Sequence, residues 1–182
     1  KRIPLTVTGP FGDPISCYYG YLPETSTAVI EMAAAAGITL SDRHAPLTAT
    51  TRGVGEIILD AVRRGCRDFI IGIGGSATND GGIGMLSALG FSFLSENGSD
   101  AGEGGQALGK VCSVDISGQD PRLKDCRFRV ACDVTNPLCG KNGATYIYGP
   151  QKGVTEDMKE PLDQAMSHYA RVCASFLGKD CS

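Results

Sequence analysis

The sequence predicts an α/β fold with a mixed sheet (α+β), built as one domain over residues 1–182. Short apolar, β-branched runs alternate along the chain with segments whose apolar residues recur at helical spacing. Residues 68–73 are almost entirely apolar and are followed by glycine, which is typical of a strand buried on both faces. With 182 residues, of which 42% are hydrophobic, the chain can bury a full-sized core.

The N-terminal part predicts a hairpin and a third strand. Apolar and polar residues alternate over residues 3–7, a turn rich in glycine and proline follows, and residues 15–22 are expected to return beside the first strand. Residues 28–31 are short and β-branched, and they end in Glu31. The alanine-rich residues that follow end at Gly37, which fits a short helix with a glycine cap.

The middle of the chain predicts helices on either side of a buried strand. Apolar residues recur at helical spacing over residues 54–62, after threonines that can cap a helix. The strand of residues 68–73 leads into a glycine-rich run, residues 72–82. A second helix is expected over residues 83–89, and a short strand over residues 91–94.

The C-terminal part predicts a loop, strands and a long helix. Residues 96–109 are rich in glycine, serine, asparagine and acidic residues and are expected to form a loop. Residues 111–116 and 128–133 are typical of strands. A helix is expected over about residues 155–176, where Gly178 ends it.

Charge and hydropathy exclude several classes of partner. The net charge is −3, whereas a nucleic-acid backbone needs a basic face, so nucleic acid is not an expected partner. No apolar run reaches the roughly 18–20 residues that span a bilayer, so no membrane association is expected. Because the chain starts at Lys1, we expect an excerpt of a longer protein.

The cysteines predict reduced thiols in a cytoplasmic protein. None of them forms a Cys-x-x-Cys pair, and the chain has only two histidines, so a zinc site is not expected. A disulfide scaffold is not expected either, because the chain can build a core without one. The cysteines are Cys17, Cys66, Cys112, Cys126, Cys132, Cys139, Cys173 and Cys181.

The glycine-rich run predicts a site for an anion. Backbone N–H groups at the start of a helix are unsatisfied and favour negative charge, and glycines let a ligand approach the backbone. The expected anion contacts are Gly74, Gly75, Ser76, Thr78 and Asn79. Asp80 could ligate Mg²⁺ or take a hydroxyl proton. Gly81, Gly82 and Gly84 each cost up to ~1 kcal/mol in a helix interior, which we interpret as room for a ligand. The alternative is a tight turn capped by Asn79 or Asp80.

A dinucleotide-binding loop is a rival interpretation of the same run. Gly72-x-Gly74-x-x-Ala77 fits the fingerprint of nicotinamide-dependent oxidoreductases, and Glu96 could hold a ribose. The run carries too many polar residues before the helix, so we favour the anion site over this interpretation.

Four further residues are candidates outside the glycine-rich run. Asp133 ends a predicted strand and could hold a metal ion or orient a hydroxyl, with an Asx-turn into Asn136 as the alternative. Lys152 and Arg52 each precede or begin a predicted helix and could neutralise a phosphate or carboxylate. Their alternatives are a solvated lysine and ordinary helix capping.

Together these stretches resemble the glycerate kinase family that includes the bacterial glycerate 2-kinases. The most specific are GGSATNDGG within residues 72–82 and GPQKG within residues 148–153. The matching stretches appear in family order and cover nearly the whole chain. They are residues 8–10, 29–33, 50–56, 72–82, 131–138 and 148–153.

The resemblance implies ATP- and Mg²⁺-dependent phosphorylation of D-glycerate to 2-phosphoglycerate. It also implies a two-domain protein of about twice this length, in which a restriction-endonuclease-like domain is inserted into a Rossmann-like domain. This chain resembles the inserted domain and would supply one wall of the cleft between the two. The family's Asp-Ser-Phe-Lys-Gly and Gly-Glu-Gly-Arg stretches, both expected at that cleft, do not occur in this chain.

The resemblance also carries site residues over to this chain. The matching positions are Gly74, Gly75, Ser76, Thr78, Asn79, Asp80, Asp133, Asn136 and Lys152. We expect catalytic roles for Asp80, Asp133 and Lys152, with Mg²⁺ on one of the two aspartates. The glycine-loop residues, together with Arg52 and Asn136, are expected to bind substrate or phosphate. Alternatively, the chain alone is a non-catalytic binding half, and an apolar face meant for the other domain could pair two copies as a homodimer.

Overall fold

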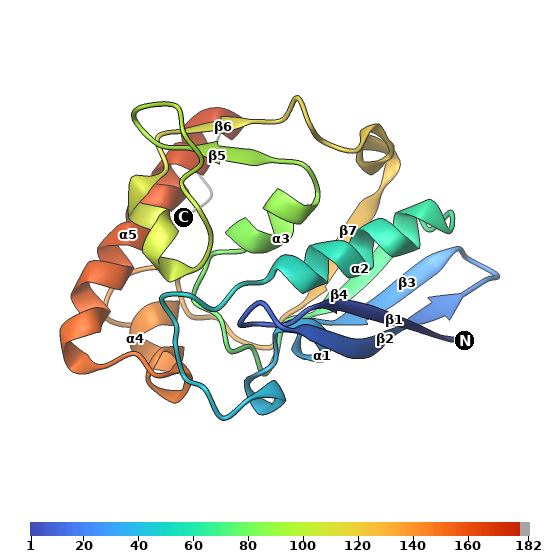
Figure 1. Ribbon diagram of the computed structural model, residues 1–182, viewed down its shortest axis with the longest axis horizontal. Coiled ribbons are helices and arrows are strands. Elements are labelled where there is room, and N and C mark those ends of the chain that lie inside the picture. The colour runs from blue at the N-terminus through green and yellow to red at the C-terminus, as the bar shows by residue number, and fades with distance from the viewer. Residues whose placement is uncertain (179–182) are drawn as a thin grey trace.

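A five-stranded mixed sheet forms one side of the molecule (Figure 1), in a computed structural model that describes residues 1–178. The strand order is β1–β2–β3–β4–β7. Strand β2 is antiparallel to both of its neighbours, β1 and β3, and its pairing with β1 is the predicted hairpin, whereas β3, β4 and β7 run parallel. The strands are β1 (Arg2–Thr8), β2 (Pro14–Leu22), β3 (Thr27–Glu31), β4 (Asp68–Gly72) and β7 (Arg127–Ala131).

The three parallel strands end at the same edge of the sheet. Glu31 pairs with Gly72, and Gly72 pairs with Ala131, so the segments that follow these three residues leave the sheet side by side. The carboxyl ends of parallel strands are where open sheets present ligand-binding groups. The register therefore brings the glycine-rich run next to the segment that contains Asp133.

Helix α2 (Arg52–Arg63) packs on one face of the sheet. Its apolar stripe, including Ile57 and Ile58, meets Phe69 and Ile71 of β4, and all four are buried. The alternate residue Ile70 points to the other face and is only half-buried. The prediction that this strand is buried on both faces is therefore wrong, because in the part of the chain that the structure describes its alternate residues stay only half-buried.

A second apolar cluster lies beside the sheet, between helix α5 (Glu156–Leu177) and the segments around α3 (Ile83–Ala88). A small sheet of β5 (Ser92–Leu94) and β6 (Ser113–Asp115) contributes Phe93, and α5 contributes Met166 and Tyr169. Leu86 of α3 packs against both clusters. Phe91, three residues after α3 ends, packs against both clusters as well, so α3 and the segment that follows it link the two.

The short elements differ most from the sequence-based expectation. The predicted loop of residues 96–109 contains a 3₁₀ helix at Gly105–Lys110, and the strand expected over residues 128–133 ends at Ala131. Helix α4 (Ala144–Tyr148) was not predicted, because five residues give no measurable periodicity. The remaining short helices are α1 (Ala33–Ala36) and the 3₁₀ segments Ile38–Leu40, Pro121–Asp125 and Pro150–Lys152.

Within residues 1–178, no helix has both the length and the apolarity that a bilayer crossing requires. Among the cysteines there, Cys66 is buried, whereas Cys112 and Cys132 are exposed. Cys181 lies outside the described residues. Most cysteines in residues 1–178 are thus buried or partly buried, and Cys112 and Cys132 are the exceptions.

Candidate active site

A cavity of about 550 Å³ opens at the edge where the parallel strands end. Its walls come from the glycine-rich loop between β4 and α3, the segment after β7, and the segment from α4 to the 3₁₀ helix Pro150–Lys152. Met32, Thr51 and Met166 complete it. The structure brings together nine of the ten predicted site residues in this lining: Gly74, Gly75, Ser76, Thr78, Asn79, Asp80, Asp133, Asn136 and Lys152.

Glycine stands at these positions for different structural reasons. A Cβ on Gly74 would meet no atom within 4 Å, so the space beside it is open. By contrast, a Cβ on Gly84 would lie 2.1 Å from Thr50 Oγ1, and one on Gly81 would lie 3.0 Å from the Tyr169 ring. The interpretation that Gly81 and Gly84 leave room for a ligand is therefore wrong, because other parts of this chain occupy that space.

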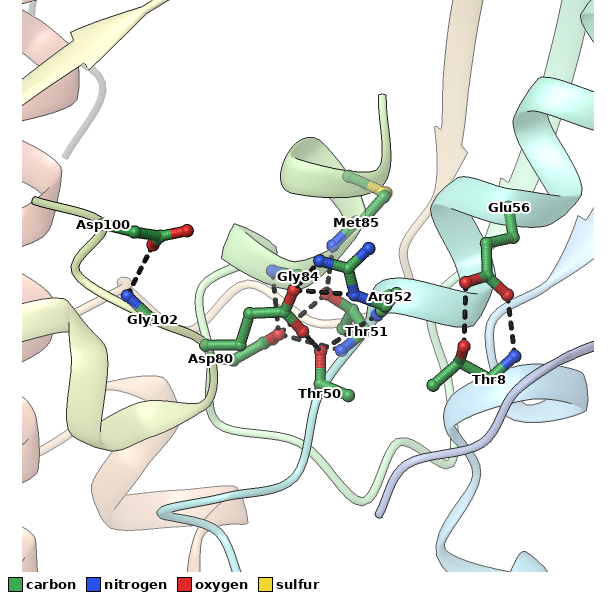
Figure 2. A network of polar contacts seen from close by, with 11 residues as sticks. Thr8, Thr50, Thr51, Arg52, Glu56, Asp80, Gly84, Met85, Asp100 and Gly102 are labelled. Carbon is green, nitrogen blue, oxygen red and sulfur yellow. Dashed lines mark hydrogen bonds and ion pairs between the residues drawn. The ribbon is translucent and has the colours of Figure 1, made fainter. Parts of the chain in front are cut away.

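Asp80 is buried behind the loop, and protein donors surround its carboxylate (Figure 2). Oδ2 accepts hydrogen bonds from Thr51 N at 2.9 Å and Thr51 Oγ1 at 2.8 Å, with a longer one from Gly84 N at 3.4 Å. Oδ1 accepts one from Gly82 N at 3.2 Å. Burial raises the pKa of Asp80, while these hydrogen bonds act in the opposite direction. The carboxylate thus joins the starts of α2 and α3 and fixes the end of the loop.

Lys152 ties the far wall of the cavity to the same loop. Its Nζ donates a hydrogen bond to the Thr78 carbonyl oxygen at 2.8 Å. Burial lowers the pKa of Lys152, and the negative charge of Asp80 opposes that shift. One ammonium hydrogen is used in this contact, so the cation can still donate to an anion in the cavity.

Helix α4 connects two stretches that were predicted separately. Asn79 Nδ2 donates to Thr145 Oγ1 at 3.2 Å, and Thr145 is fully buried. Tyr148 OH donates to Asn136 Oδ1 at 2.5 Å, and Asn136 Nδ2 donates to the Asn142 carbonyl oxygen at 2.9 Å. Residue-level reasoning missed Thr145 and Tyr148, although Tyr148 begins one of the family-like stretches.

Asp133 is the exposed carboxylate of the cavity wall. Because β7 ends two residues earlier, Asp133 lies on a loop and not at the end of the strand as predicted. No cluster of three or more potential ligands among His, Cys, Asp and Glu occurs within residues 1–178. Mg²⁺ usually takes one or two carboxylates and completes its shell with phosphates and water, so a single accessible aspartate fits Mg²⁺ brought in with a nucleotide.

Arg52 is the predicted residue that the structure does not bring to the cavity lining. Its guanidinium pairs with Glu103 through Nε at 2.7 Å and through Nη2. Glu103 also accepts a hydrogen bond from Thr50 Oγ1 at 2.7 Å. Arg52 therefore anchors the segment around Glu103 to the start of α2, a role that its position in the sequence did not indicate.

The dinucleotide-binding interpretation does not fit this geometry. The fingerprint requires a helix to begin within the glycine-rich turn, so that its N-terminus meets the pyrophosphate. Here α3 begins at Ile83, eleven residues after β4 ends at Gly72 by the printed bounds. Glu96, the expected ribose ligand, does not line the cavity. This alternative is rejected.

The family model and the similar proteins that match this chain agree on one family. The model of the glycerate kinase family matches residues 1–182. The glycerate kinase of Bacillus subtilis (strain 168) is 52% identical over 180 residues, which cover 98% of this chain and 47% of that protein. The glycerate 2-kinase of Escherichia coli (strain K12) is 53% identical over 176 residues, covering 96% of this chain and 46% of that protein.

A solved structure agrees with the fold. A crystal structure from Salmonella typhimurium LT2, described as a glycerate kinase 2, matches with a TM-score of 0.95 at 47% identity. The match covers 99% of this chain and 49% of that one. The chain thus spans about half the length of the curated relatives it matches.

Proposed function

The chain belongs to the glycerate kinase family, and from this premise we propose that the whole protein phosphorylates the 2-hydroxyl of D-glycerate with ATP. The product is 2-phosphoglycerate, and this chain supplies one wall of the cleft. The supporting observation is the cavity itself, which gathers family-matched residues from segments far apart in the sequence around one open glycine loop. Fold alone would not carry this proposal, because function depends on the site.

The chemistry is an in-line phosphoryl transfer. The glycerate 2-hydroxyl oxygen forms a bond to the γ-phosphorus of ATP, the bond from that phosphorus to the bridging oxygen breaks, and ADP leaves. Enzymes of this class mainly position the reactants and offset charge. Mg²⁺ bound with the nucleotide would supply positive charge beside the phosphates, and one oxygen of Asp133 would ligate it, which leaves the other oxygen for the substrate hydroxyl.

We assign the two aspartates different roles. Asp133 is exposed in the cavity, so it can meet the reacting hydroxyl and accept its proton. Asp80 has its oxygens engaged by Thr51, Gly82 and Gly84 and acts as a positioning residue. This separation follows the rule that environment sets the role of each carboxylate at a site.

The remaining lining residues supply anion contacts. Lys152 offsets negative charge, and the loop residues Gly74, Gly75 and Ser76 offer the backbone and side-chain donors that a phosphate or carboxylate needs. Thr78 and Asn79 hold the loop against Lys152 and Thr145. Arg52 supports the start of α2 through Glu103.

The proposal includes the rest of the protein. The five-stranded mixed sheet fits a restriction-endonuclease-like domain, and the part outside this chain would be the Rossmann-like domain that closes the other side of the cleft. Relatives of about twice this length support that arrangement. The alternative proposal is that residues 1–182 alone bind a ligand without turnover.

Substitution in the full-length protein tests the assignment. We expect Asp133→Asn to reduce kcat by about 10²–10⁴-fold, the usual range for loss of a general base, with little change in Tm. Asp80→Asn should lower Tm as well as activity, because the amide places a donor against backbone donors. Asp42→Asn, at an exposed position outside the cavity, is the control. Near-wild-type turnover of glycerate and ATP by both variants would contradict the assignment.

Two cysteines offer a direct test of ligand binding. Cys132 lines the cavity and Cys112 does not, and both are exposed. D-Glycerate or Mg-ATP should slow alkylation of Cys132 but leave Cys112 unchanged if the ligand occupies this cavity. Calorimetry with each ligand on residues 1–182, together with a turnover assay, separates a binding half from a complete enzyme. Turnover by this chain alone would exclude the half-site alternative.

A further inference from the structure

One wall of the cavity is apolar, in contrast to the glycine-rich loop. It is formed by the segment after β7 and by α4, and its members, which we call the apolar wall, are Pro137, Leu138, Ala144 and Tyr148. The backbone joins the two segments, because Ala144 N donates a hydrogen bond to the Leu138 carbonyl oxygen at 3.1 Å. Such a wall suits a part of a ligand that carries little charge.

The polar side chains beside the apolar wall do not favour an anion there. Asn136 already uses both ends of its amide, since Oδ1 accepts from Tyr148 OH at 2.5 Å and Nδ2 donates to the Asn142 carbonyl oxygen at 2.9 Å. The charged side chain of the same segment is Asp133, which is negative. A phosphate or a carboxylate would therefore be repelled at this wall and would find few donors.

The donors that an anion needs lie on the neighbouring walls. Lys152 is the cationic residue of the lining within residues 1–178, and Gly74 borders open space on the loop. D-Glycerate, a three-carbon acid with two hydroxyl groups, has no large apolar part to place against the apolar wall. A cavity of about 550 Å³ is also larger than such a molecule needs, and it falls in the range that holds ligands several times bigger, about 300–1,000 Å³. Of the two substrates, only the nucleotide has a part that fits, namely its base.

Tyr148 gives the apolar wall an aromatic ring. It is the one aromatic residue of the cavity lining in the part of the chain that the structure describes. Its ring is half-buried, and the hydrogen bond to Asn136 holds it in place, so little freedom remains to be lost when a ligand binds. Every nucleobase has a flat face that stacks on such a ring. Lys152 follows Tyr148 by four residues, which places a cation for phosphate next to the ring.

We propose that the apolar wall binds the base of the nucleotide, stacked on the ring of Tyr148, with the phosphates directed toward Lys152 and the glycine-rich loop. This inference rests on the proposed function, in which ATP is the phosphate donor, and it assigns the nucleotide to one part of the cavity. D-Glycerate then lies in the remaining part, beyond the γ-phosphate. The ring of Tyr148, and not its hydroxyl group, makes the contact with the base.

Calorimetry on the full-length protein tests the base site with two ligands, ADP and inorganic pyrophosphate, at one Mg²⁺ concentration. Tyr148→Ala should weaken ADP binding by about 5- to 150-fold, the usual loss when a stacked aromatic ring is removed. It should leave pyrophosphate binding unchanged, because pyrophosphate has no base. Tyr148→Phe keeps the ring and should keep the affinity for ADP. Tyr146→Ala is the matched control, since Tyr146 lies on the same helix but outside the cavity lining, with its hydroxyl group on Glu160.

Three results would overturn the proposal. Unchanged ADP affinity in Tyr148→Ala would show that the base lies elsewhere, and equal losses for ADP and pyrophosphate would show that Tyr148 acts on the phosphates. A loss in Tyr148→Phe as large as that in Tyr148→Ala would assign the effect to the hydroxyl group. Tyr148→Leu, which keeps apolar volume without an aromatic face, repeats the test if Tyr148→Ala does not fold.

The same measurements separate this proposal from the proposed function. ADP binding that depends on Tyr148, in a protein that does not phosphorylate D-glycerate, would refute the proposed function and leave the base site intact. Turnover of D-glycerate and ATP by a protein whose ADP affinity is independent of Tyr148 would refute the base site alone.

Discussion

At the residue scale, two carboxylates near one cavity have opposite environments. Asp80 is buried among backbone and hydroxyl donors, whose hydrogen bonds stabilise its carboxylate and fix the loop. Asp133 is exposed on the opposite wall. Engaged oxygens cannot readily accept a substrate proton or a metal ion, whereas exposed ones can. The same residue type therefore positions the site in one place and faces the ligand in the other.

Gly74→Ala should separate binding from stability. The new methyl group would project into open space beside the loop, so we expect a change in unfolding free energy within about 0.5 kcal/mol. It would stand where an anion approaches the backbone, and a tenfold rise in KM corresponds to about 1.4 kcal/mol. Steady-state kinetics and thermal unfolding of the full-length protein measure both effects. Unchanged KM for both substrates would show that no ligand approaches Gly74.

The burial of Lys152 predicts an alkaline limb in the pH profile of kcat/KM. Burial lowers its pKa below the ordinary 10.5, so the cation is lost as pH rises through that lowered value and anion binding weakens. Lys152→Arg should move this limb to higher pH, because arginine stays charged. Stability should change in the opposite direction to anion binding as pH rises. The unfolding free energy should increase between the lowered pKa and 10.5, because only the unfolded state stays protonated there. Superimposable kcat/KM profiles would contradict the prediction.

At the element scale, glycines set how closely α2 approaches strand β1 and helix α3. A Cβ on Gly53 would lie 2.0 Å from the Thr8 carbonyl oxygen, and one on Gly55 would lie 2.3 Å from that of Met85. Gly84 faces the start of α2 in the same way. Close approach lets Thr51 Oγ1 accept a hydrogen bond from Met85 N at 2.9 Å while donating one to Asp80. The two helix starts are thus locked beside the loop.

Gly84→Ala should destabilise the protein by about 1–3 kcal/mol or more, the range for overpacking a filled interior. The added Cβ would be forced against Thr50 Oγ1 and the Arg52 backbone nitrogen, and α3 would have to move. Gly109→Ala is the matched control, since its Cβ would meet Ala165 at an ordinary 3.5 Å. Chemical denaturation measures both variants, and equal midpoints would show that the crossing is not tightly packed.

At the scale of the whole molecule, two apolar clusters meet at α3 and at Phe91 just after it. The first lies between α2 and the large sheet, the second lies against α5, and Leu86 contacts both. The cavity lies between segments from both regions, since it is lined by the loop after β4 and by Met166 of α5. Coupling between the clusters therefore affects the shape of the site.

Leu86→Ala should weaken both clusters together. We expect a loss of about 2 kcal/mol, at the low end for such a truncation because the side chain is only partly buried. Amide exchange should accelerate in both α2 and α5. Leu59→Ala, whose side chain contacts only the first cluster, should affect α2 more than α5. Faster exchange confined to one helix in Leu86→Ala would show that the clusters are independent.

The sequence by itself determined the features that depend on local spacing. Periodicity located the hairpin, the strand at β4 and the helices α2 and α5. Alternation and helical repeats depend only on residues that are near one another in the sequence, so the sequence records them directly. The composition of residues 72–82 likewise marked the loop that became one cavity wall. Boundaries of short elements were missed, since 3₁₀ segments and α4 lack a repeat.

Only the tertiary structure decided how the site is assembled. Asp80 meets Thr51 across 29 residues, Asn79 meets Thr145 across 66, and Lys152 meets Thr78 across 74. No local pattern records such pairings, because they arise from strand register and helix crossing. For the same reason Arg52 could be expected at the anion site, although Glu103, 51 residues away, holds it elsewhere. Burial, which separates Asp80 from Asp133, is a property of the folded chain alone.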